Sequence, residues 1–276
     1  AFGEAKAFDR AVRYYQKALH AEDGQMTLRD IEQLANLQAR EAARRMSGEN
    51  RAALLPDIDQ AIHLLEMVMG LRPGAGETPE AAAGPVLAKT SERLSLLGGS
   101  YKRRAWISAD GREAALAQVA RFYRAAFELA QDQGRFDAYP LLNWLTAEVC
   151  LAWQKGIPPF ADATGPDRLQ LLQQTLAELD RAIEKEKNFW TIVMRVDAEL
   201  LQALCQGELT ARQISLIAEK YRDAAQLGSP REYASVLDQI EFLIAMTGEQ
   251  KHIAKHLTSL RRKLDATGAK KGRKPE

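Results

Sequence analysis

Apolar residues are distributed along this chain in the way that is typical of α-helices. Nearly every segment carries them at positions i, i+3, i+4 and i+7, and alternating runs of Val, Ile and Thr are absent from the sequence. Such spacing predicts helices that each bury one face. The all-α fold class predicted here has eleven helices, over about residues 4–21, 27–46, 50–71, 86–105, 111–133, 138–155, 166–186, 188–206, 210–227, 231–247 and 249–266.

Residues that start and stop helices stand between these segments. Side chains with an oxygen that suits a helix N-cap are Thr27, Asp137, Asp167, Thr210 and Ser229. Glycines that suit helix C-termini are Gly134, Gly207, Gly228, Gly248 and Gly268. We therefore expect a helical domain over residues 1–266 and a basic, disordered C-terminal tail over residues 267–276.

One spacing of side chains recurs four times. It has a small or aliphatic residue, a larger residue four positions later, and another small or aliphatic residue three positions after that. The four sets are Ala11, Tyr15 and Ala18; Ala61, Leu65 and Val68; Val119, Tyr123 and Ala126; and Ile217, Tyr221 and Ala224. The segment Leu97-Gly98-Gly99-Ser100-Tyr101 precedes the third set. Four sets at one spacing indicate an internal repeat.

These motifs resemble the tetratricopeptide repeat, with Leu-Gly-x-x-Tyr in its first helix and the recurring spacing in its second. The resemblance covers most of the chain as degenerate repeats. It departs from the family in period, because Ala11 and Ala61 are 50 residues apart. The resemblance implies a right-handed α-solenoid of antiparallel helix pairs whose first helices line the ligand groove.

A narrower resemblance lies in residues 92–98, 139–145 and 229–236. These segments are similar to repeat regions that are attached to caspase-like or other effector domains in multidomain bacterial proteins. They are distantly similar to the central regulatory region of apoptosis-signalling kinase kinase kinases. This resemblance implies a signalling role, as the sensing or scaffolding arm of a larger protein.

The first predicted helix carries the second-helix spacing, so its partner helix would lie upstream of Ala1. A helix without its partner would leave apolar surface bare. We therefore expect a fragment of a longer chain, and artificial trimming of the natural chain is the alternative.

Composition and charge exclude several classes of protein. The 276 residues include 38 Lys plus Arg and 37 Asp plus Glu, a net charge of +1 that gives no whole-molecule attraction to nucleic acid or membrane. Residues 261–276 carry +5, so residues 1–260 carry −4. Nucleic acid is therefore expected only in non-specific contact with the tail, against the alternative of a solvated terminus. The sequence has only two cysteines and no long apolar run, which favours a reducing cytoplasm and no membrane span.

We find no constellation of residues that would carry catalysis, a metal or a cofactor. His252 and His256 have the i, i+4 spacing of metal ligands but lack a third ligand in the sequence nearby. Cys150 stands in an apolar stretch that disfavours a reactive thiolate, so a buried structural role is expected. The loop at 74–78 lacks the lysine of a phosphate-binding loop. The sequence therefore predicts a non-enzyme without cofactors.

Three residues are candidates for contact with a partner. One turn beyond Leu97-Gly98 the same helix carries Lys102 and Arg103, and the resemblance places them in the groove, where they would meet a partner carboxylate. Simple solvent exposure is the alternative for both. Asn143 stands in an apolar stretch, where a buried amide must be hydrogen-bonded either to a neighbouring loop or to a bound main chain.

The predicted function is a non-enzymatic helical repeat domain that binds protein or peptide, within the same chain or in another, as the regulatory or scaffolding arm of a larger protein. The alternative is a purely structural domain that docks against an upstream catalytic domain of the same chain.

Overall fold

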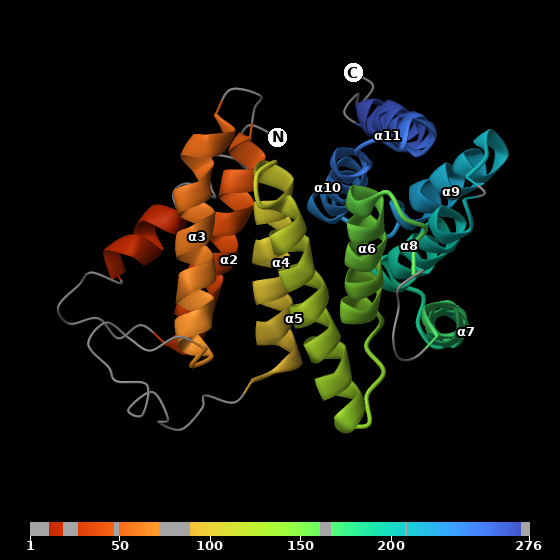
Figure 1. The fold of residues 1–276 in the computed structure, drawn as a ribbon. Helices are drawn as coiled ribbons and strands as arrows, with labels where there is room; N and C mark the ends of the chain where they lie inside the picture. Colours follow the sequence, from red (N-terminus) through yellow and green to blue (C-terminus); the bar gives the residue numbers. More distant parts are fainter. Residues whose placement is uncertain are drawn as a thin grey trace, which may run out of the picture. The chain divides into compact units, whose positions relative to one another are not determined.

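The computed structural model describes residues 11–18, 27–46, 50–71, 89–160, 167–207 and 209–271 (Figure 1). Every regular element in these ranges is a helix, so the predicted all-α class is confirmed. The chain divides into two compact units, Ala1–Pro140 and Leu141–Glu276, and each is described by itself.

The first unit contains two helix pairs. Its helices are α2 (Leu28–Arg45), α3 (Arg51–Val68), α4 (Ser91–Ile107) and α5 (Arg112–Asp132), preceded by helical residues 11–18. Helix α2 packs on α3 and α4 packs on α5, while α4 also contacts both helices of the preceding pair (Figure 1). Few residues separate the two helices of each pair, so the packed helices are antiparallel, as the repeat pattern predicts.

Small residues let α2 and α3 approach each other. Ala35, Ala39 and Ala42 lie on one face of α2 and are fully buried, in the same core cluster as Ile58 and Leu65 of α3. Burying a Leu or Ile side chain contributes about 1.5–3 kcal/mol, so this face accounts for a large part of the pairing energy.

The second unit continues the series of helices. Helix α6 (Ala138–Lys155) begins in the first unit and runs on into the second. It is followed by α7 (Arg168–Lys185), α8 (Phe189–Gln206), α9 (Ala211–Ala224), α10 (Pro230–Met246) and α11 (Lys251–Lys271). Helix α8 contacts α7 and α9, and α11 contacts α9 and α10, so neighbouring helices in the sequence again pack together (Figure 1).

Most of the predicted helix starts are confirmed by their caps. Thr27, Thr210 and Ser229 each form a capping box, and the Asp167 carboxylate accepts two backbone N–H groups. Helix α4 begins at Ser91 instead of about residue 86, because the Thr90 hydroxyl accepts the Arg93 N–H and caps the helix there.

Helix α11 ends at Lys271, five residues beyond the predicted end at 266, so the first part of the predicted disordered tail is helical. Residues 272–276 lie outside the described ranges, as do most of the residues predicted to form the first helix. Across the described part of the chain we find no helix with the length and apolar character that crossing a membrane requires.

Candidate partner-binding site

The α4–α5 pair is built around a close approach between Gly98 and Tyr123. A Cβ atom on Gly98 would lie 2.8 Å from Cδ2 of the Tyr123 ring, so only glycine fits at this position. Tyr123 and Ala126 of α5 are buried, as is Leu97 of α4, while Tyr101 is half-buried. The close contact of Gly98 with Tyr123 and the burial of Leu97 and Ala126 thus accompany the pairing of the two helices.

The Tyr123 hydroxyl is buried next to a second tyrosine. It lies 3.2 Å from the hydroxyl of Tyr139, whose side chain is 49% exposed. Burial raises the pKa of Tyr123 well above its ordinary value, and the adjacent Tyr139 raises the pKa further, while the Arg103 guanidinium acts in the opposite direction. The buried Tyr123 hydroxyl is therefore hydrogen-bonded to a tyrosine whose ring is exposed to solvent.

Lys102 and Arg103 lie beside this cluster on α4, and both are half-buried. Nη1 of Arg103 donates to the Gly99 carbonyl at 2.9 Å, one turn back on the same helix. Lys102 also interacts within the protein. Neither side chain is therefore fully exposed to solvent, and both already interact within the protein. That they bind a carboxylate of a partner stays a prediction.

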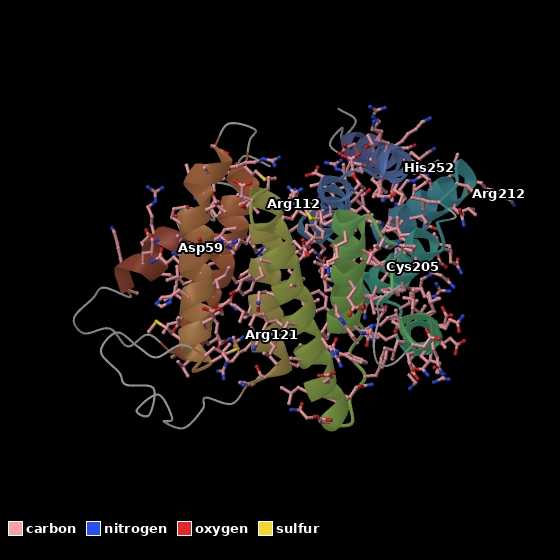
Figure 2. The ribbon with its side chains drawn as sticks, viewed as in Figure 1. Asp59, Arg112, Arg121, Cys205, Arg212 and His252 are labelled. Carbon is pink, nitrogen blue, oxygen red and sulfur yellow. The ribbon has the colours of Figure 1, made fainter. Side chains whose placement is uncertain are left out.

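Other polar side chains of α4 connect it to the preceding helix pair. Nε of Arg93 donates to Glu32 of α2 at 2.5 Å, and the Tyr101 hydroxyl donates to Glu66 of α3 at 2.8 Å. Nε of Arg104 donates to Asp59 of α3 at 2.7 Å, and Figure 2 labels Asp59 on that helix. These pairs were not predicted from the sequence, because partners such as Glu32 and Arg93 are 61 positions apart and leave no local pattern.

Asn143 belongs to α6 in the second unit, where it is half-buried and interacts with other groups of the protein. Lys102 and Arg103 therefore lie together on α4 in the first unit, whereas Asn143 lies in the second unit. Whether Asn143 holds a loop or meets a ligand stays open.

A second polar cluster that the sequence analysis missed joins α6 to the start of α7. The Trp144 indole N–H donates to Glu148 at 2.8 Å, and Arg168 donates to both oxygens of the same carboxylate, at 2.8 and 3.1 Å. The Arg168 guanidinium lies 4.6 Å from the centre of the Trp144 ring, a cation–π contact. Arg168 is 4% exposed, so the cluster is part of the core.

The remaining repeat-motif residues divide into two groups. Ala61, Tyr221 and Ala224 are fully buried, and the Tyr221 hydroxyl donates to Asp197 of α8. In the helical residues 11–18, by contrast, Ala11 and Tyr15 are half-buried and Ala18 is exposed. The first motif is therefore the least buried of the four among the described residues.

The candidates for chemistry have ordinary structural settings. His252 and His256 stack edge to face at 4.5 Å, and in the described ranges no three His, Cys, Asp or Glu side chains come together as a metal site. Partial burial, His252 and Lys255 lower the pKa of His256. Cys150 is buried, and burial raises the pKa of Cys205 to about 12, which disfavours a reactive thiolate.

The stacked helix pairs, the Gly98–Tyr123 contact and the buried Tyr221 at the matching motif position define a helical repeat protein of the tetratricopeptide class. A family model described as Tetratricopeptide Repeats-Sensor (TPR-S) matches residues 7–148, just over half of the 276 residues, and the chain belongs to this family. The tetratricopeptide-like fold predicted from the sequence is thereby confirmed. No curated protein and no solved structure matches the chain. Helices α7 to α11 lie beyond the matched range.

Proposed function

We propose that this chain is a non-enzymatic module that binds a protein or peptide, and that it acts as the regulatory or scaffolding arm of a larger, effector-bearing protein. The observation that carries the proposal is the TPR-S match over residues 7–148, which covers both helix pairs of the first unit. The family description contains the word sensor, which accords with a regulatory arm. A bacterial, cytoplasmic signalling protein is the setting that we propose for it, and the two free cysteines suit a reducing compartment.

The surface we propose for the partner follows the first helices of the pairs, α2 and α4, which contact each other. On α4, Arg103 donates one N–H to the Gly99 carbonyl. A guanidinium has five donors, so Arg103 keeps the capacity to bind a partner carboxylate while this hydrogen bond persists. Lys102 adds positive charge beside it. Asn143, on α6 in the second unit, is proposed as a separate contact.

The test is quantitative capture of partners from a host lysate by the 276-residue chain and its variants. The double variant K102E/R103E reverses the two charges on α4. The matched control K89E/R135E makes the same change in charge at two exposed positions of the same unit. We expect the α4 variant to lose at least 90% of each specific partner, while the control retains it. Equal capture by both variants would remove the α4 site from the proposal.

An intramolecular structural role is the second candidate, and the internal contacts of α4 favour it. Arg93 and Arg104 are already paired with acidic residues of α2 and α3, so much of the positive charge on α4 serves the fold. In that case the isolated chain captures no specific partner, whereas the parent protein shows α4 protected from hydrogen exchange by its neighbouring domain.

A further inference from the structure

Helix α11 presents a row of basic side chains to solvent. Exposed along it are Lys251, His252, Lys255, Arg262 and Lys263. The other side of the helix carries three leucines that are fully buried: Leu257, Leu260 and Leu264. Figure 2 labels His252 on this helix. The packing of the leucines fixes the helix, so the basic face (Lys251, His252, Lys255, Arg262 and Lys263) is held in one orientation.

The positive charge of the chain is concentrated on this helix. Lys251–Lys271 contains seven Lys or Arg and one acidic residue, a net +6, whereas the whole chain is +1, so the rest carries −5. The one acidic residue, Asp265, pairs with Arg261, and Arg261 also donates to Glu241 of α10 at 2.8 Å. Asp265 and Glu241 thus both pair with Arg261.

The exposed basic residues form two groups, Lys251 to Lys255 and Arg262 with Lys263, about two helical turns apart. The length over which they extend suits a polyanion. Lys251 and Lys255 are about 6 Å apart along the helix axis, and Lys251 and Lys263 about 18 Å. At about 3.4 Å per phosphate of one strand, that length corresponds to about five phosphates of a nucleic acid duplex. We infer that the basic face of α11 binds the phosphate backbone of double-stranded nucleic acid without reading its bases.

Two other classes of anionic partner fit the face less well. A membrane-bound helix inserts apolar side chains, but the leucines of α11 are buried in the core. Protein interfaces are anchored by buried aromatic or apolar residues, and Lys251–Lys271 contains no Phe, Tyr or Trp. The absence of aromatic residues also disfavours single strands, which proteins hold by stacking on their bases.

The test measures binding of a labelled duplex of about 20 base pairs to the full chain by fluorescence anisotropy, from about 50 mM salt upwards. The variant K251E/K255E/R262E reverses three positive charges of the basic face and leaves His252 and Lys263 unchanged. The matched control R181E/K185E/K187E makes the same change in charge at exposed positions around the end of α7, in the same unit. We expect the α11 variant to bind at least tenfold more weakly than the control. The slope of log affinity against log salt should be about −4 to −5 for the natural sequence and fall by about 3 in magnitude in the variant.

Proton NMR of the imidazoles gives a second, site-specific measurement. The chain has four histidines, and we expect the signals of His252 and His256 to shift on addition of the duplex while that of His63 on α3 does not. Circular dichroism establishes that each variant is folded. The inference is overturned if the natural chain does not bind the duplex at about 50 mM salt, or if both triple variants lose affinity equally. Preferential binding of phosphatidylserine vesicles or of polyglutamate over the duplex would overturn it as well.

Discussion

At the scale of single residues, two glycines lie where a Cβ atom would overlap an aromatic ring. Gly98 faces Tyr123. The sequence predicted only that the Leu97-Gly98 motif belongs to the first helix of a repeat pair. Gly228 faces Phe189, where a Cβ would lie 2.3 Å from the ring, yet the sequence suggested only that Gly228 ends a helix. The first contact was predictable only in part, because the resemblance placed Gly98 in a helix that pairs with the helix of Tyr123 but did not identify the ring. The second depends on a ring 39 positions away, which no local pattern reveals.

Gly98→Ala should destabilise the first unit. Its Cβ would overlap the Tyr123 ring, and overpacking of this kind costs about 1–3 kcal/mol. Gly99→Ala is the matched control, because its Cβ would lie 3.3 Å from the end of the flexible Arg103 side chain, and alanine favours a helix over glycine by about 1 kcal/mol. Unfolding in urea should therefore show a clearly lower free energy of unfolding for Gly98→Ala and little or no decrease for Gly99→Ala. Equal stability of the two variants would contradict the close packing.

Two buried tyrosines should make the fold sensitive to alkali. Burial raises the pKa of Tyr123 and of Tyr221 well above 10.0, so the folded chain holds these protons more tightly than the unfolded chain does. The stability they contribute is complete below pH 10 and is lost as the pH rises toward their folded-state pKa values.

The measurement is the free energy of unfolding as a function of pH above 10. The variant Y123F/Y221F should lose stability less steeply than the natural chain, by up to about 1.4 kcal/mol per pH unit for each tyrosine removed. Tyr14→Phe is the control, because Tyr14 is 71% exposed. If Y14F changes the slope as much as the double variant does, the two buried hydroxyls are not responsible.

At the scale of helices, boundaries were more predictable than partners. Caps such as Thr27 and Asp167 act within three or four residues, so the sequence around them is sufficient to predict a helix start. The pairs Arg93–Glu32 and Arg168–Glu148 join different helices, and their geometry exists only after packing. For the same reason Lys102 and Arg103 were correctly placed on one helix, while their half-buried environment was not predicted.

The Glu148–Arg168 pair should stabilise the contact between α6 and α7 strongly. Glu148→Ala would leave the guanidinium of Arg168, whose side chain is 3% exposed, without this carboxylate, at a cost of about 3–5 kcal/mol. The double variant E148A/R168M should be more stable than E148A, because no charge is then left buried. Glu178→Ala is the control, since its pair with Arg181 is exposed and contributes less than about 1 kcal/mol. If E148A and E178A have the same melting temperature, the Glu148–Arg168 pair contributes little to stability.

At the scale of the whole molecule, the domain organisation reflects how repeats pack. The motifs predicted one repeat domain over residues 1–266, and the structure divides into two compact units after Pro140. Helices in such an array contact mainly their neighbours in sequence, as α4 does with α3 and α5. The motif spacing recurs on both sides of residue 140 and therefore predicted a single domain. Such a local pattern carries no information on how the chain divides into compact units.

Local packing of this kind predicts that damage stays within one unit. Gly98→Ala should speed amide hydrogen exchange in α4 and α5 by about tenfold and leave α8 to α11 unchanged, because stability is a sum of neighbouring interfaces. Leu260→Ala is the reciprocal variant: Leu260 is fully buried in α11, and its truncation costs about 2–5 kcal/mol within the second unit. Exchange measured by mass spectrometry should show the two effects in separate sets of peptides. If either variant speeds exchange equally in both units, the chain unfolds as one cooperative block and the division after Pro140 has no energetic meaning.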